Sequence, residues 1–140
     1  MDYSIKNERF LKKVLWLDAL LGGLTAVLGL LFFKVLTNLL GLSVNLILTV
    51  STITLLYATV AFVLAIQKPI SVRLLKILVN ANWIWTAISV LMLFIHLGSA
   101  TMLGYLLLIM QIMVVGGLAY LEGSQIIKSQ FNPDNDRKHS

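Results

Sequence analysis

The sequence contains no cysteine, only two prolines and only two histidines, and acidic residues are scarce. Without cysteine the chain has no disulfide bond, no thiolate nucleophile and no cysteine-ligated metal site. Charged residues make up 12% of the 140 residues, whereas ordinary globular domains carry roughly 25%. The composition therefore argues against a soluble globular domain, and a chain of this length is expected to form one domain.

Motifs of the common enzyme and cofactor classes are also missing. The sequence has no G-x-S-x-G, no Walker phosphate loop and no dinucleotide fingerprint. His96 and His139 lie far apart, and because no cysteine can complete a ligand set, neither haem nor zinc is expected. We therefore expect no enzymatic activity, no cofactor and no metal.

Long apolar runs dominate what is present, since 59% of the residues are hydrophobic. Four runs reach the roughly 20 apolar residues that a bilayer-spanning helix needs. They cover residues 14–36, 44–66, 74–97 and 102–122. The sequence thus predicts an all-α fold, an integral membrane four-helix bundle formed by residues 14–122.

The basic residues follow the pattern of membrane topology. Of the eleven Lys and Arg, ten fall in the N-terminal segment 1–13, the loop around Pro69 and the polar tail 123–140. These three segments would lie on one side of the membrane, and Lys34 alone would lie on the opposite side. The positive-inside rule then places both termini and the Pro69 loop in the cytoplasm, an N-in/C-in topology. Because these charges flank apolar segments, the net charge of +5 does not indicate nucleic-acid binding. The lipid bilayer is the expected surrounding.

Five side chains inside the spans are candidates for a functional site. They are Asp18, Tyr57, Asn82, Trp85 and Gln111. At about 1.5 Å per helical residue, the four polar groups Asp18, Tyr57, Asn82 and Gln111 lie roughly 6–16 Å from the cytoplasmic ends of their helices, with Trp85 beside them. Polar and ionisable groups at such depth are costly, and each needs a partner.

The same polar layer allows two interpretations. In the first, the layer forms a pocket that is open to the cytoplasm and binds a ligand or relays a proton. In the second, its members bond one another and only stabilise the bundle. Asp18 also has an ordinary alternative, a pairing with Lys12 or Lys13 near the interface. Glu122 is placed at the cytoplasmic mouth, whereas His96 falls near the outer end of its helix, too far away for a His–carboxylate dyad.

Small residues recur on one face of two spans. Gly22, Ala26 and Gly29 share a face of the first span, and Gly116, Ala119 and Gly123 share a face of the fourth. Such faces let helices approach closely. They predict helix packing, either in a homodimer through the glycine faces of spans one and four or against a partner protein.

Four segments carry a resemblance to a known group: WLDALLGG (16–23), LLYA (55–58), NANWIW (80–85) and LGYLLLIMQ (103–111). The chain resembles a group of small bacterial four-span inner-membrane proteins with an L-D-A-L, Tyr, N-x-x-W and late Gln pattern. Leu56 stands where that group usually has a proline before the tyrosine. The group has no established activity, so the resemblance implies a multi-pass protein of the bacterial inner membrane and the five candidate residues, but no reaction.

Three functions follow as hypotheses. The first is a small integral membrane protein that binds a small or lipid-like ligand in a polar pocket in the cytoplasmic half of the bundle. The second is a proton-coupled homodimeric transporter that uses Asp18, similar in size and span count to small multidrug exporters. The third is a membrane scaffold or regulatory subunit.

Overall fold

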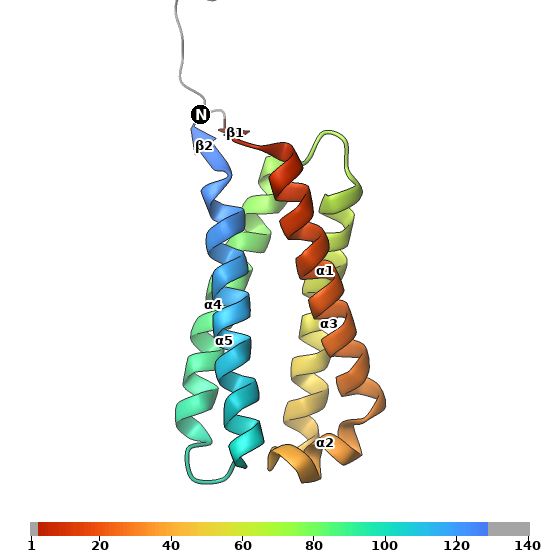
Figure 1. The fold of residues 1–140 in the computed structure, drawn as a ribbon, viewed down its shortest axis with the longest axis vertical. Coiled ribbons are helices and arrows are strands. Elements are labelled where there is room, and N and C mark those ends of the chain that lie inside the picture. The colour runs from red at the N-terminus through yellow and green to blue at the C-terminus, as the bar shows by residue number, and fades with distance from the viewer. Residues whose placement is uncertain (1–2, 129–140) are drawn as a thin grey trace, which may run out of the picture.

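The computed structural model describes residues 3–128, which form a bundle of four long helices (Figure 1). These helices are α1 (Glu8–Leu31), α3 (Val44–Ile66), α4 (Val72–Ile95) and α5 (Met102–Ser124). Each is long and apolar enough to cross a membrane. The remaining elements are the short helix α2 (Phe33–Leu40) and the strands β1 (Tyr3–Ile5) and β2 (Ile126–Lys128). The predicted all-helical fold with four long apolar helices is confirmed.

Each long helix begins at a polar side chain that caps its first turn. The capping residues are Asn7, Ser43, Ser71 and Thr101, and each accepts a hydrogen bond from the backbone N–H three residues later. Such a bond satisfies one of the backbone N–H groups that lack a partner inside the helix. The caps therefore fix where the four helices start.

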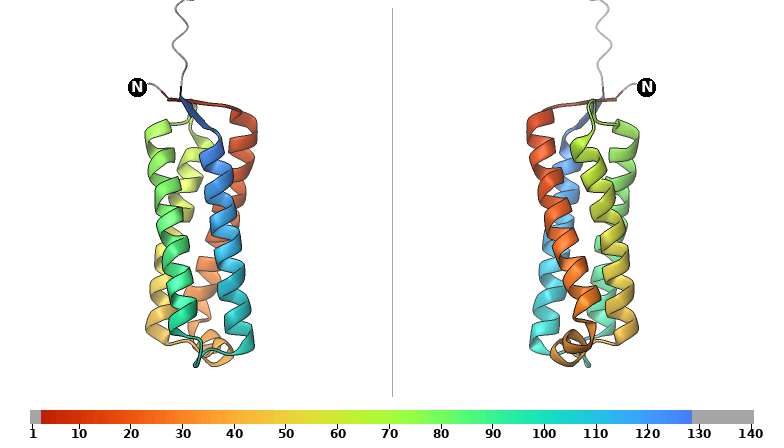
Figure 2. Two further views of the ribbon diagram at one scale, coloured as in Figure 1. Left: turned by 90° about the vertical axis from the view of Figure 1, so that its left-hand side faces the viewer. Right: turned by 90° about the vertical axis from the view of Figure 1, so that its right-hand side faces the viewer.

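The helices associate as two hairpins. Helix α1 packs along α3 and α4 packs along α5, and the two pairs meet through smaller contacts of α1 with α5 and of α3 with α4 (Figure 2). The α3–α4 loop and the two strands lie at one end of the bundle, whereas α2 and the α4–α5 loop lie at the other (Figure 1). Most of the candidate residues lie at or near the seam between the two hairpins.

The first span differs from the sequence-based prediction. Residues 14–36 were expected to form one helix after a separate lead-in 1–13, but α1 begins at Glu8 and ends at Leu31. Asn7 supplies the cap and Glu8 an acid in the first turn, both of which stabilise a helix start there. Helix α2 then takes up part of the connection expected between the first two spans. It ends at Leu40 and is capped by Gly41, whose positive φ of 69° suits glycine.

The start of the predicted tail 123–140 is ordered. Strand β2 pairs with β1 in antiparallel register, Tyr3 opposite Lys128 and Ile5 opposite Ile126. Lys6 N–H donates to the Gln125 carbonyl at 2.8 Å and Asn7 N–H to the Gln125 side chain at 3.1 Å. These bonds tie the beginning of α1 to the end of α5. The rest of the predicted tail lies outside the described residues.

The glycine faces are used inside the chain. A Cβ on Gly29 would fall on the Ser51 hydroxyl of α3, and one on Gly22 would lie 3.2 Å from Ala58 Cβ. On α5, a Cβ on Gly116 would lie 3.4 Å from Thr86 Cγ2 of α4. The glycine faces thus bring the helices of each hairpin together, and a homodimer stays a prediction that needs other surfaces.

An apolar core fills the end of the bundle that carries the strands. Leu11 and Leu15 of α1, Leu64 of α3, and Leu75 and Leu78 of α4 are almost completely buried there. Outside the core, the long helices expose many large apolar side chains. A surface of this kind suits contact with lipid chains.

Candidate functional site

Two carboxyl groups meet in the interior of the bundle. Asp18 of α1 is 8% exposed, Glu122 of α5 is 0% exposed, and the two side chains lie within hydrogen-bonding reach of each other. Asn82 of α4, 3% exposed, donates from Nδ2 to Glu122 Oε2 at 3.3 Å and also lies beside Asp18. Three helices from both hairpins thus contribute one polar group each.

Helical periodicity explains why these side chains point inward. Asp18 follows Leu11 and Leu15 on the buried face of α1, and Asn82 follows Leu75 and Leu78 on that of α4. Residues three, four and seven apart share one face of a helix. Packing of the leucines therefore carries the polar groups into the interior.

Part of the hydrogen-bonding capacity of the site is unused. Asp18 Oδ2 and Glu122 Oε1 are buried, and neither has a hydrogen-bond partner among residues 3–128. Two adjacent carboxylates without a cation repel each other, and a buried charge is costly when unpaired. A proton or a small cation between them would satisfy both oxygens, so the arrangement is complementary to one positive charge.

No basic side chain supplies that charge within the described part of the chain. Lys12 pairs with Glu8 one turn away, with Nζ and Oε1 3.6 Å apart. The expected alternative, in which Lys12 or Lys13 pairs with Asp18, does not occur among the ion pairs of residues 3–128. Asp18 is thus buried against another acid and an amide.

Gln111 lies in a separate layer. Its Nε2 donates to Ser89 Oγ at 2.8 Å, and the Ser89 hydroxyl donates to the Trp85 carbonyl at 2.8 Å. Both residues belong to the α4–α5 hairpin. Gln111 therefore connects two helices of one hairpin. One sequence interpretation had it bonding Asn82 or Tyr57, and it bonds neither.

Tyr57 reaches the seam by aromatic contact. Its ring meets that of Trp85 edge to face, with centroids 6.1 Å apart and an interplanar angle of 63°. Trp85 is buried at 6% exposure, whereas Trp83 is 47% exposed. The Tyr57–Trp85 pair thus joins α3 to α4 about one turn from Asn82.

The structure brings together four of the five predicted residues at or near the seam, and it adds Glu122. Sequence reasoning placed Glu122 at the cytoplasmic mouth because it lies near the end of an apolar run. Gln111 and Glu122 are eleven residues apart, about three helical turns, so they share a face of α5. That spacing is the signal that predicts an inward-facing Glu122.

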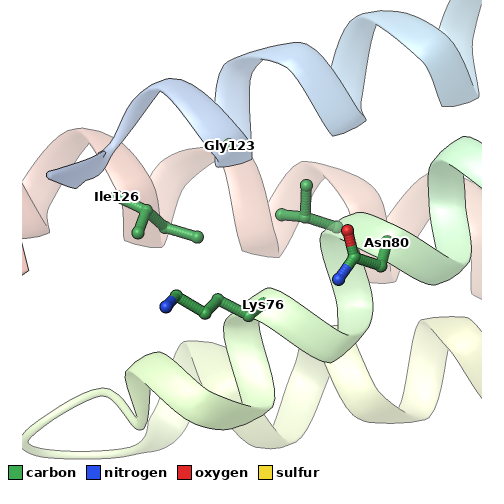
Figure 3. A pocket seen from close by; sticks show the side chains of 5 residues that line it. Lys76, Asn80, Gly123 and Ile126 are labelled. Carbon is green, nitrogen blue, oxygen red and sulfur yellow. The ribbon is translucent and has the colours of Figure 1, made fainter. Parts of the chain in front are cut away.

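A cavity of about 300 Å³ lies elsewhere, between α4 and the end of α5 (Figure 3). It is lined by Lys76, Val79, Asn80, Gly123 and Ile126. None of the five predicted residues lines it. In residues 3–128, no group of three or more His, Asp or Glu side chains could hold a metal ion.

Comparisons of the chain with known protein families, with curated proteins and with solved structures found no match.

Proposed function

We propose that this protein is a small integral membrane carrier that exchanges a proton for an organic cation at the Asp18–Glu122 pair. In this proposal the four long helices span the cytoplasmic membrane of a bacterium, with both termini and the Pro69 loop inside. The distribution of ten of the eleven basic residues supports that topology. One observation carries the function: two buried acids lie together, and each keeps an oxygen without a partner.

A proton and an organic cation would compete for the same pair of carboxylates, and this competition can couple the transport of the two. A bound proton and a bound cation both relieve the repulsion between two carboxylates, so each disfavours binding of the other. The Asn82 amide adds a donor to Glu122 and orients it. A site with this chemistry releases a proton when a cation arrives.

The aromatic neighbours support an organic rather than a metallic cation. Trp85 lies about one turn after Asn82 on α4, and Tyr57 of α3 contacts the Trp85 ring. Aromatic rings attract organic cations through their electron-rich faces and also accept apolar substituents. An acid pair beside two such rings is complementary to a lipophilic cation.

Entry to the site requires motion of the hairpins. The apolar core of Leu11, Leu15 and Leu78 packs between the carboxyl pair and the end that carries the strands. Because the hairpins meet through smaller contacts than those inside each hairpin, we propose that they move as two bodies. The carboxyl pair lies between these bodies.

A proton-release measurement tests the carrier. Tetraphenylphosphonium is added to purified protein in weakly buffered detergent, and bound cation and released protons are counted together. We expect close to one proton for each cation bound. Asp18→Asn and Glu122→Gln should each abolish release, because either substitution removes one of the two carboxyls.

Glu8→Gln is the matched control, since Glu8 is an exposed acid on α1 that pairs with Lys12. It should release protons like the wild type. Cation binding without proton release, or equal release from Asp18→Asn, would contradict the proposal. The ligand-binding and scaffold hypotheses would then take precedence.

A further inference from the structure

The cavity between α4 and α5 combines a cation, an amide and apolar walls. Lys76 and Asn80 of α4 contribute the polar groups, and Val79 and Ile126 contribute apolar surface (Figure 3). Gly123 forms part of the wall on α5, where a Cβ would lie 3.3 Å from Val79 Cγ1. No acidic side chain is among its lining residues, so the site is complementary to an anion with apolar substituents.

The Lys76 side chain is held in place by the N-terminal strand. Its Nζ lies 2.8 Å from the centroid of the Tyr3 ring, a cation–π contact with β1. Strand β1 is itself fixed by pairing with β2, whose Ile126 lines the cavity. Lys76 thus lines the cavity with its ammonium group held against the Tyr3 ring, and that group has no ion-pair partner within residues 3–128.

Asn80 lies one turn after Lys76 on α4, where its other exposed neighbours are apolar. It is exposed between Ile77 and Ile84, which are 58% and 60% exposed. The Asn80 side chain makes no hydrogen bond to any residue in 3–128. An amide on a lipid-facing surface needs a partner, and the headgroup region of the bilayer can supply one.

The position of the cavity along the bundle also suits contact with phospholipid headgroups. Its lining residue Ile126 belongs to β2, so the cavity lies near the end of the bundle that carries the strands and the α3–α4 loop (Figure 1). Most of the basic residues of the described chain also belong to segments at this end. Lysine side chains at this depth extend toward phospholipid headgroups. Anionic lipids are attracted to such basic positions.

We propose that this cavity binds the phosphate-bearing headgroup of an anionic phospholipid. Lys76 and Asn80 contact the phosphate and its neighbouring oxygens, and the acyl chains follow the exposed Ile77 and Ile84 surface of α4. The site is separate from the Asp18–Glu122 pair, so it does not depend on proton exchange.

Native mass spectrometry of protein released from mixed micelles tests this site. The micelles contain equal amounts of phosphatidylglycerol and phosphatidylcholine, and the lipids retained on each protomer are counted. One lysine near anionic lipid contributes about a fivefold preference, so the wild type should retain phosphatidylglycerol about fivefold over phosphatidylcholine. Lys76→Gln should lose that preference, and Asn80→Leu should reduce it.

The control is Lys13→Gln, which removes an exposed lysine of α1 outside the cavity. It should keep the wild-type preference, and all variants are checked for helical content by circular dichroism. Equal retention of the two lipids by the wild type would overturn the site, as would an equal loss in Lys13→Gln. Displacement of the lipid by millimolar glycerol 3-phosphate would assign the cavity to a free phosphate and overturn the lipid assignment.

Discussion

At the scale of single residues, the polar side chains inside the apolar runs differ in what they contact. Asp18 and Asn82 could be predicted to need partners in the interior because they lie inside apolar runs, where an unpaired polar side chain is costly. Glu122 was placed at the mouth because an acid near a helix end is usually solvated, and its spacing of eleven residues from Gln111 was the one signal of an inward face. Its burial comes from packing against Asp18 and Asn82, a contact between residues far apart in the sequence.

Asn82→Leu should lower the free energy of unfolding. The substitution removes the amide that donates to Glu122 Oε2 and leaves that buried oxygen without a partner. The cost of stranding a buried acceptor is about 1–3 kcal/mol. Unfolding by sodium dodecyl sulfate in mixed micelles, followed by circular dichroism, measures the change.

Asn80→Leu is the control for this prediction, because Asn80 is exposed on the opposite face of α4. It should leave the stability within about 0.5 kcal/mol of the wild type. Equal losses for the two variants would mean that the amide of Asn82 has no special role in the carboxyl site.

At the scale of elements, the bounds of a helix could be predicted where a capping residue or a proline marks its ends. Residues 44–66 were predicted with the bounds that the structure has, since Ser43 caps that helix and Pro69 interrupts the loop after it. The break between α1 and α2 could not be predicted, because the apolar run continues through Phe32. Pairing of β1 with β2 was also missed, since it joins segments more than 100 residues apart.

Gly104→Ala should destabilise the end of the bundle opposite the strands. A Cβ at Gly104 would fall on the Leu40 carbonyl oxygen of α2, and backbone cannot move as easily as a side chain. Overpacking of this kind costs about 1–3 kcal/mol. The same denaturation in mixed micelles measures the loss.

Gly117→Ala provides a matched control on the same helix, since nothing lies within 4 Å of a Cβ there. Because alanine favours the helix over glycine, this variant should be unchanged or more stable by up to about 1 kcal/mol. A Gly104→Ala protein as stable as Gly117→Ala would show that α2 does not pack against α5 as described.

At the scale of the whole molecule, the charge distribution leads to a predicted topology, whereas the pairing of the helices could not be predicted from the sequence. All four long helices are apolar on most of their surface, so no face stands out as the inner one. The sequence therefore predicted one polar layer across four helices. The structure instead has a carboxyl site that joins the hairpins and a separate Gln111–Ser89 bond within one hairpin.

The topology is tested by cysteine labelling, and the absence of native cysteine removes any background. In intact cells an impermeant thiol reagent should label Ser99→Cys in the α4–α5 turn and should not label Ser71→Cys. Both should react after permeabilisation. The reverse pattern in intact cells would place the Pro69 loop outside. Ser129, a further cytoplasmic position by the charge pattern, lies outside the described residues.

The central claim is that Asp18 and Glu122 form one buried pair that binds and releases a proton. Infrared difference spectroscopy of the protein in lipid nanodiscs, with stepwise changes of pH, measures this directly. We expect a protonated-carboxyl band that changes with pH and that disappears in both Asp18→Asn and Glu122→Gln. Glu8→Gln should keep the band. A spectrum with no titrating band that depends on Asp18, or a band that is unchanged in Glu122→Gln, would contradict the account.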